Sequence, residues 1–553
     1  MKITFAFLAL IIVASCCAQN LSVEKPRFTN DDSLRGSMNA NRTWWNVLRY
    51  DLEVEPDYNS RTIKGRNTIK FSGSAGKTMQ IDLQQPLIID SILLNNEHLP
   101  FERKNNVCLV TINHKIKANS NDEHYISIFY HGKPVEAVKP PWDGGWIWTK
   151  DELGRPWMSV ACQGIGASVW YPCKDHQSDE PDEGASLTMV VPDTLVAVGN
   201  GRLISKIDYK NTSIYRWEVR NPINNYNLVP SIGKYENFTE IFNGEDGKLT
   251  CNYWVLDYDL EKAQEQFKQV KPMLQCFENW FGPYPFYEDG YQLVESPHLG
   301  MEHQSAVAYG NKFTNGYLGK DLSGTGWGNL WDFIIIHESG HEWFGNNITS
   351  NDIADMWVHE GFTNYSETIY TECQSGKKAA SEYIQGIRKN IRNDKPITGT
   401  YGVNNEGSGD MYSKASNMLH TIRTIINNDS LFRMILRGLN KDFYHKTVNA
   451  TDVENYISTK AGIDFTLLFQ QYLHTTKIPV VEWKISDNKI SVRLNNAISG
   501  LTMNMWIPVA DYKGVWKNIA ANKWTTLDCK LTEVKTELLW DKNFYVEYRA
   551  VNP

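Results

Sequence analysis

The feature that most constrains the fold is a change of hydrophobic period near residue 259. From about residue 45 to 250, apolar and polar residues alternate between Asn, Gly and Asp turns, as in "NTIKFSG" and "HYISIFYHG", which predicts β-strands. Afterwards, until about residue 475, apolar residues recur at helical spacing, as in "SNMLHTIRTIIN". Short strand-like segments return after Pro479. Because the three parts differ in period, the sequence predicts a multidomain α+β fold.

The length of the chain also favours several domains. Its 553 residues exceed what one hydrophobic core usually holds. We predict a β-rich N-terminal domain, a mainly helical domain and a small C-terminal β-sandwich, which span residues 19–240, 241–477 and 478–553. In the first helical stretch, "DLEKAQEQFKQVKPMLQCFENWFG", Pro272 is expected to kink or interrupt the helix.

The N-terminal segment, residues 1–18, reads as an export signal. One lysine precedes an apolar run of signal-peptide length that ends in small residues, and no second apolar stretch of about 20 residues follows it. Cleavage after Ala18 would release the protein, whereas Val13-Ala14-Ser15-Cys16 resembles a bacterial lipobox, which would leave a lipid on Cys16. Both outcomes stay open. We expect a periplasmic, cell-surface or secreted protein, attached to a membrane only if Cys16 carries a lipid.

Charge and cysteine content argue against two classes of site. The formal net charge is −8 and no block of Lys or Arg occurs, so nucleic acid is not an expected partner. Of nine cysteines, two lie in the N-terminal segment and none of the others forms a CxxC pair, which disfavours a thiolate zinc site. Export permits disulfides, but we expect most of these cysteines to be buried thiols.

The stretch "FIIIHESGHEWFGN", residues 333–346, carries two histidines four positions apart. In a helix, His337 and His341 lie on one face and can present two imidazole nitrogens to one ion. Zinc accepts such nitrogens at about 2.0–2.1 Å. The motif alone leaves open a buried helix with two hydrogen-bonded histidines.

A second predicted helix, "IADMWVHEGFTNYSETIY", supplies a third ligand. Eighteen residues separate His341 from Glu360, which leaves room for a turn and an antiparallel helix, and Gly361 lets backbones approach. His337, His341 and Glu360 are therefore predicted to hold one Zn²⁺ per chain with an open fourth position, an arrangement suited to hydrolysis.

Two more glutamates lie on the same predicted helices. Glu338 cannot share the direction of the histidines, so it is suited to take a proton from a zinc-activated water as general base. Glu367, one heptad after Glu360, could accept a hydrogen bond from a ligated histidine. An ordinary solvent-facing role for Glu367 stays open.

Upstream, "SPHLGMEHQSAVAYG" places a glycine just before an acidic residue, as at a strand edge that approaches a substrate backbone. Here the chain resembles peptidase family M1, the gluzincin zinc aminopeptidases that include membrane alanyl aminopeptidase and leukotriene A4 hydrolase. In that family the GxMEN glutamate grips the free α-amine of the substrate. The matching residues are Gly300, Met301 and Glu302.

The resemblance extends from about residue 45 to the C-terminus. "ACQGIGASVWYPCKD" is similar to the family segment that ends in PCxD, and its Gln163 matches a glutamine beside the amine-binding glutamate. "MYSKASNML" resembles the YxKG segment, which implies that Tyr412 stabilises the tetrahedral intermediate. The family fold implies a thermolysin-like catalytic domain.

The chain departs from the family pattern at several points. His303 replaces the Asn of GxMEN, His359 replaces the Asn before the third ligand, and Ala415 replaces the Gly of YxKG. The first change puts a contact with the substrate backbone in doubt, and His359 is either an extra titrating group near the metal or a surface histidine. Because the sequence stops soon after the small β-domain, without the large helical domain of many relatives, we expect an open site.

The resemblance implies a zinc-dependent aminopeptidase acting on peptides with a free N-terminus. Glu302 and Gln163 would hold the α-ammonium, with Gly300, Met301 and His303 beside them. The alternatives are a thermolysin-type endopeptidase, which would leave Glu302 without a purpose, a lipid-epoxide hydrolase, which no residue specifically favours, and a non-catalytic surface-binding protein. The intact ligand set, with Glu338 and Tyr412, argues against the last.

Overall fold

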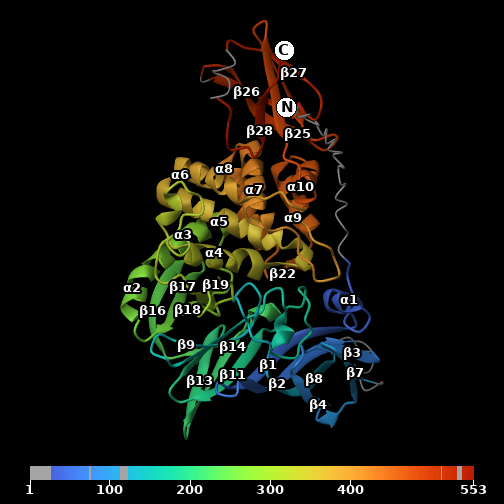
Figure 1. Cartoon of the computed structure of the whole chain (residues 1–553), viewed down its shortest axis with the longest axis vertical. Helices are drawn as coiled ribbons and strands as arrows, with labels where there is room; N and C mark the ends of the chain where they lie inside the picture. Colours follow the sequence, from blue (N-terminus) through green and yellow to red (C-terminus); the bar gives the residue numbers. More distant parts are fainter. Residues whose placement is uncertain (1–26, 74–75, 113–121, 512, 532–538, 553) are drawn as a thin grey trace, which may run out of the picture.

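The computed structural model describes residues 27–73, 76–112, 122–511, 513–531 and 539–552. The predicted export signal and Cys16 lie outside these ranges. Along the long axis, a β-rich region at one end, a helical middle and a second β region at the other end follow one another (Figure 1). This arrangement confirms the predicted multidomain α+β fold.

The N-terminal region is built from three sheets within the described residues. The largest has the strand order β13-β14-β11-β1-β2-β8-β4-β5, the second β12-β15-β10-β9 and the third β3-β7-β6. Their buried faces share one hydrophobic cluster that includes Trp146, Trp170 and Trp217. The strands are β1 (Trp45–Asp57), β2 (Thr62–Gly73), β3 (Thr78–Asp82), β4 (Ile88–Leu94), β5 (Glu97–His98), β6 (Phe101–Lys104), β7 (Val107–Thr111), β8 (Glu123–Gly132), β9 (Gly145–Lys150), β10 (Pro156–Ala161), β11 (Ala185–Pro192), β12 (Val196–Val198), β13 (Arg202–Tyr209), β14 (Thr212–Val219) and β15 (Ser231–Gly233).

The helical region begins with its own sheet, ordered β16-β17-β18-β20-β19 among the described residues. β16 straddles the domain boundary predicted at residue 240. The strands are β16 (Tyr235–Gly244), β17 (Gly247–Leu256), β18 (Tyr291–Glu295), β19 (Gly300–Met301) and β20 (Val307–Tyr309), and β21 (Ile348–Ser350) pairs separately with β22 (Lys446–Val448). The edge strand β19 carries Gly300 and Met301.

The helices pack against this sheet and against one another (Figure 1). The predicted break near Pro272 is present: a 3₁₀ turn at residues 267–269 separates α2 from α3. Pro272 then lies in the first turn of α3, where its missing N–H costs no intrahelical bond. The helices are α2 (Leu260–Gln266), α3 (Val270–Phe281), α4 (Phe333–Gly340), α5 (Trp357–Ser375), α6 (Lys377–Gly386), α7 (Ser413–Ile426), α8 (Asp429–Asp442), α9 (Ala450–Ala461) and α10 (Thr466–Leu473).

The C-terminal β region packs directly on the helices. Its strands are β23 (Val480–Ser486), β24 (Lys489–Asn495), β25 (Thr502–Ala510), β26 (Lys513–Ala520), β27 (Thr525–Asp528) and β28 (Glu547–Ala550). Tyr545 donates its backbone N–H to Thr421 Oγ1 at 2.9 Å, and Tyr472 donates to the Tyr545 carbonyl at 2.5 Å. Trp483 and the helical core belong to one hydrophobic cluster, so this region is continuous with the helices.

Two of the described cysteines, Cys276 in α3 and Cys373 in α5, form a disulfide. The other described cysteines are free and buried: Cys108, Cys162, Cys173, Cys251 and Cys529.

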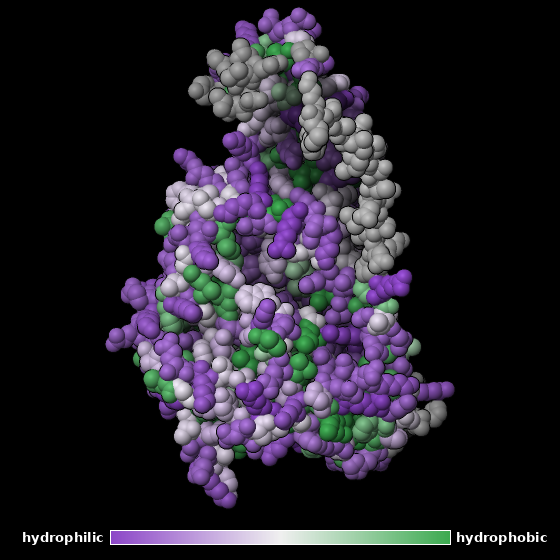
Figure 2. All heavy atoms as spheres, viewed as in Figure 1, coloured by the Kyte–Doolittle hydropathy of each residue, from purple (hydrophilic) through white to green (hydrophobic). Residues whose placement is uncertain are grey.

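The visible face of the protein is largely hydrophilic, with apolar residues in small scattered patches (Figure 2). Among the described residues, no helix has both the length and the apolar character needed to cross a bilayer.

Candidate active site

Helix α4 carries the two histidines and is held firmly at its start. Asp332 is its N-cap, and the carboxylate accepts the backbone N–H groups of Ile334 and Ile335 at 3.0 and 3.3 Å. Such a cap satisfies donors that have no partner within the helix. The helix ends at Gly340, and His341 is its C-cap. Both histidines are at most 5 % exposed.

The three predicted metal ligands converge as α4 and α5 pack side by side. His337 Nε2 lies 3.6 Å from Glu360 Oε2, and His341 Nε2 lies 3.4 Å from the same oxygen. Glu360 Oε2 is buried, and no described residue forms a hydrogen bond with it. A buried carboxylate oxygen that faces two imidazole nitrogens is suited to bind a metal ion, so these residues fit the predicted zinc site.

The other ring nitrogens of the two histidines are occupied. His337 Nδ1 lies 2.8 Å from Glu367 Oε1. His341 Nδ1 lies 3.0 Å from the Phe344 carbonyl and 3.1 Å from Thr363 Oγ1. These contacts orient both rings so that Nε2 faces Glu360, which is how ligating histidines are usually held. Glu367 is therefore buried beside His337 and does not face solvent.

Glu338 lines the same cleft, and its carboxylate lies within 4.8 Å of a ring nitrogen of each histidine. A Cβ placed on Gly300 would lie 2.7 Å from Glu338 Oε1, so the edge strand β19 passes close to this carboxylate only because Gly300 has no side chain. Burial raises the pKa of Glu338 to about 7. A carboxyl group with that pKa can exchange a proton near neutral pH.

Glu302 forms a second buried carboxylate next to the metal ligands. It is 2 % exposed, and its carboxylate, a His341 nitrogen and a Glu360 oxygen lie within 4.8 Å of one another. Glu302 Oε1 accepts hydrogen bonds from Gln163 Nε2 and, at 3.0 Å, from the Tyr226 hydroxyl. Because these donors already satisfy Glu302, and Glu360 Oε2 has none, Glu360 is the better third ligand.

Two residues of this pocket were not predicted from the sequence. Tyr226 holds the Glu302 carboxylate, and Asn346 Nδ2 donates to the Glu302 backbone carbonyl at 2.8 Å. Asn346 ends the stretch that contains both histidines, so its nearness in sequence was a usable signal. Tyr226 lies in a short 3₁₀ helix (Asn225–Asn227) of the N-terminal region, and no pattern distinguishes it from the other tyrosines.

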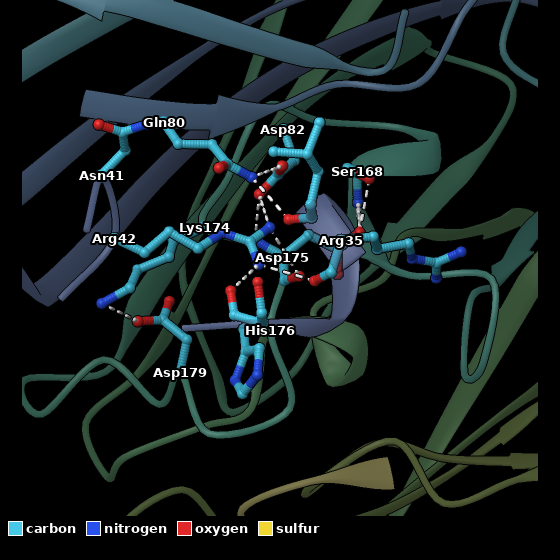
Figure 3. Close-up of polar contacts among 12 residues, drawn as sticks. Arg35, Asn41, Arg42, Gln80, Asp82, Ser168, Lys174, Asp175, His176 and Asp179 are labelled. Atoms are coloured by element: carbon cyan, nitrogen blue, oxygen red, sulfur yellow. Dashed lines mark hydrogen bonds and ion pairs between the residues drawn. The ribbon is translucent and has the colours of Figure 1, made fainter. Parts of the chain in front are cut away.

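The loop that carries Gln163 is tied to a buried polar network in the N-terminal region (Figure 3). Arg42 is fully buried and donates to Asp82 Oδ2 at 2.5 Å and to the Asp175 carbonyl at 3.3 Å. The Asp175 carboxylate accepts the Ser168 backbone N–H at 3.2 Å and its hydroxyl at 2.5 Å. These buried hydrogen bonds and the ion pair hold the segment around Ser168 in place.

The residue after Gln163 is held from two other elements. Arg35 of α1 (Asn30–Gly36) donates from Nη2 to the Gly164 carbonyl at 2.5 Å. Asn404 Nδ2, from the loop that precedes α7, donates to the same carbonyl at 3.1 Å. These two hydrogen bonds fix the backbone next to Gln163.

Tyr412 lies at the start of α7, with its ring 6.0 Å from the His337 ring and nearly parallel to it. Burial raises the pKa of Tyr412 well above its ordinary value, so its hydroxyl keeps a proton to donate. Behind it, a Cβ placed on Gly361 would lie 2.8 Å from Ala415 Cβ. The close approach of α5 and α7 thus depends on Gly361.

The two histidines that depart from the family pattern, His303 and His359, are both buried. His303 is 1 % exposed, packs with its ring 6.2 Å from the His298 ring, and is not among the cleft-lining residues. The structure therefore does not bring its side chain to the substrate. His359 is fully buried, and its Nε2 accepts the Ser350 backbone N–H at 2.8 Å. Burial lowers the pKa of His359 to about 3, so it is neither a surface histidine nor a group that titrates near neutral pH.

These side chains line a cleft of about 990 Å³. Its walls come from the Gln163 loop, β19, α4, α5 and the loop before α7. The lining residues include Pro141, Trp142, Gln163, Gly164, Ile165, Leu299, Gly300, Met301, Glu302, Tyr317, Leu322, Phe333, Ile334, His337, Glu338, His341, Ile353, Met356, Glu360, Asn364, Glu367, Ile387, Asn390, Arg392, Asn404, Asn405, Glu406, Asp410, Met411 and Tyr412.

Comparison with known proteins agrees with this geometry. Residues 265–472 match the family model described as the peptidase family M1 domain. Aminopeptidase N of Lactobacillus helveticus is 22 % identical over 471 residues, 79 % of this chain and 52 % of that protein. Leukotriene A-4 hydrolase of Xenopus laevis is 22 % identical over 473 residues, 80 % of this chain and 73 % of that protein.

Solved structures of M1 zinc metallopeptidases share the fold. A two-domain M1 zinc metallopeptidase bound to L-tryptophan has a TM-score of 0.67 and 19 % identity, with 79 % of this chain and 96 % of that chain covered. An M1 zinc metallopeptidase from Deinococcus radiodurans has a TM-score of 0.65 and 19 % identity, with 79 % and 95 % covered. The chain spans about half the length of the first curated relatives it matches. The ring nitrogens of His337 and His341 face a Glu360 oxygen in a buried donor set suited to Zn²⁺, the cofactor of this site.

Proposed function

We propose that the chain is a zinc-dependent aminopeptidase that removes the N-terminal residue of peptides. The observation that carries this proposal is the buried Glu302 carboxylate, which lies beside His341 and Glu360 and is held by Gln163 and Tyr226. An anion at this place receives an α-ammonium group. The scissile bond is then fixed one residue from the start of the substrate.

Each residue of the site has a separate role in the proposed reaction. His337, His341 and Glu360 would hold Zn²⁺, which supplies Lewis-acid chemistry when bound. Glu338 takes the proton of the attacking water and passes it to the leaving amine. Tyr412 donates its hydroxyl hydrogen to the oxyanion that develops on the scissile carbonyl, and removing one such donor typically costs roughly 3–4 kcal/mol of transition-state stabilisation.

An aminopeptidase differs from an endopeptidase in its need for a free amine. We expect cleavage of an amino-acid anilide and of a free peptide, no cleavage of the N-acetylated peptide, and loss of all activity with a chelator. Equal cleavage of the acetylated peptide would overturn the aminopeptidase assignment. Activity that persists after zinc has been removed, as measured by metal analysis, would overturn the metal mechanism.

We propose further that the protein acts outside the cytosol. The signal-like N-terminal segment supports this proposal, and the disulfide between Cys276 and Cys373 is typical of oxidising compartments. Fractionation of cells that express the full chain tests it, and Cys16→Ala separates the two processing outcomes. A lipid-anchored protein leaves the membrane fraction on this substitution, whereas a cytosolic location of the wild-type chain contradicts export.

A further inference from the structure

The charges along the cleft are unevenly distributed. Arg392 is the only Lys or Arg among the described residues that line it. The acidic lining residues are Glu302, Glu338, Glu360, Glu367, Glu406 and Asp410. Four of these glutamates have been placed in the reaction site or beside it. The single cation has no part in the proposed chemistry.

Arg392 has a fixed backbone and a free guanidinium group. Its backbone N–H donates to Asp410 Oδ1 at 2.8 Å, and the N–H of Asn393 donates to Asp410 Oδ2 at 2.6 Å. The Arg392 side chain is exposed, and no carboxylate of the described residues lies within 4.0 Å of it. By contrast, the buried arginines Arg42 and Arg423 each have a carboxylate partner. The guanidinium is thus available to a ligand.

The position of Arg392 places it away from the amine pocket. Its neighbour Asn390 donates from Nδ2 to the Leu322 carbonyl at 3.3 Å, on the apolar wall that Leu322 shares with Tyr317 and Phe333. The Tyr317 and Phe333 rings lie 5.3 Å apart, and Phe333 stacks on His337 at 5.1 Å.

The tip of the same loop reaches the other wall. Asn404 is bonded to Gly164, next to Gln163, at the amine pocket. Residues 390–404 therefore extend from the wall beside Leu322 to the loop that carries Gln163. Glu338, which hands its proton to the leaving amine, lies on α4 together with Phe333, and both residues line the cleft with Tyr317. We therefore place the leaving part of the substrate along the wall formed by Phe333 and Tyr317, toward Arg392.

We propose that Arg392 binds the free α-carboxylate of short peptide substrates. This proposal rests on the proposed aminopeptidase function and adds a substrate class to it. A short peptide carries an ammonium group at one end and a carboxylate at the other, and Glu302 and Arg392 match the two charges in that order. A guanidinium group suits the carboxylate because it donates two parallel hydrogen bonds to it.

The test compares a tripeptide with its C-terminal amide. A hydrogen bond to a charged group contributes enough to change kcat/KM about 10- to 100-fold. We expect the wild-type protein to prefer the free acid over the amide by that factor, and Arg392→Gln to lose the preference. Arg392→Lys should keep part of it, because an ammonium group retains the charge without the paired geometry.

Lys389→Gln is the matched control. Lys389 is exposed, lies three residues before Arg392 and is not among the cleft-lining residues, so its loss should leave the acid-to-amide ratio unchanged. Thermal unfolding of each variant shows that the fold is kept. If Arg392→Gln does not fold, the acid-to-amide ratios of kcat/KM for the wild-type protein and for Arg392→Lys test the proposal instead.

The outcomes separate this inference from the proposed function. If the wild-type protein cleaves the anilide and also cleaves the free-acid tripeptide and its amide with the same kcat/KM, that result is consistent with the proposed function but overturns the role of Arg392. An acid preference that persists in Arg392→Gln does the same. Wild-type protein that cleaves no free-amine substrate overturns the proposed function itself.

Discussion

Glu338 is the residue whose removal should affect chemistry alone. Glu338→Gln keeps the size of the side chain and the ligands His337, His341 and Glu360, but it cannot take a proton. Since a positioned general base contributes about 10²- to 10⁴-fold, kcat should fall by that factor while bound zinc stays at one per chain. Steady-state kinetics with metal analysis measure both. A variant that loses zinc together with activity would contradict the separation of base from ligand.

Tyr226 tests the amine pocket without touching the metal site. Tyr226→Phe removes the hydroxyl that donates to Glu302 at 3.0 Å. Hydrogen bonds to charged groups contribute about 1.5–3 kcal/mol, so kcat/KM for free-amine substrates should fall about 10- to 100-fold, mainly through KM. Tyr209→Phe is the control, because Tyr209 is 61 % exposed on β13. Equal kinetics in the two variants would remove Tyr226 from the pocket.

The residues that the sequence could predict are those whose partners are local. His337 and His341 share one face of α4, and Glu360 follows on the next packed helix, so spacing alone indicated the zinc site. Tyr226 reaches Glu302 across 76 positions, and no local period encodes such a contact. The burial of His303 and His359 could not be predicted, because it depends on which distant parts of the chain pack over them.

At the scale of the elements, the stability of α4 depends on its N-cap residue, Asp332. The Asp332 carboxylate accepts from five groups in all, which are Ile334 N, Ile335 N, Tyr309 Oη, Asn311 Nδ2 and Gln266 Nε2. Asp332→Ala leaves buried donors unsatisfied in addition to the lost cap, so unfolding free energy should fall by about 2–4 kcal/mol. Denaturant unfolding followed by circular dichroism measures the change.

The cap of α9 provides the comparison for that prediction. Asn449 caps α9 at an exposed position, where water can replace the lost bonds. Asn449→Ala should therefore cost only about 1 kcal/mol. If Asp332→Ala and Asn449→Ala cost the same, the buried contacts of Asp332 contribute nothing to the stability of α4.

The hydrophobic period of the sequence predicted where helices and strands occur. It did not predict which strands pair with one another. The interruption before α3 was predictable because proline acts locally. The pairing of β17 with β18 is parallel and crosses α2 and α3, and it joins strands on both sides of the change in period. For that reason the helical region acquires the sheet that carries β19, and β16 straddles the predicted boundary.

For the whole molecule, the buried apolar residues divide into two large clusters. One cluster joins the helical and C-terminal regions, and the other fills the N-terminal sheets. The proposed zinc ligands lie on or next to α4 and on α5, whose apolar residues belong to the first cluster, whereas Gln163 and Tyr226 come from the N-terminal region. The substrate cleft therefore forms where the two parts meet, and the N-terminal part supplies the side chains that hold Glu302.

This division predicts how the protein responds to metal removal. A ligand that binds only the folded state stabilises it, by about 4 kcal/mol at a thousandfold excess over its dissociation constant. Calorimetry should show that chelation lowers the unfolding temperature of the part that contains α4 and α5, and that added Zn²⁺ restores both this temperature and the activity.

His341→Ala provides the control for the metal-removal experiment, because it removes a zinc ligand and should make the unfolding temperature insensitive to chelator. Conversely, the transition of the N-terminal sheets should hardly move, since none of the proposed ligands lies there. Equal shifts in both transitions would mean that the two clusters unfold as one unit. An unchanged thermogram after metal analysis has confirmed zinc loss would mean that His337, His341 and Glu360 hold no stabilising ion.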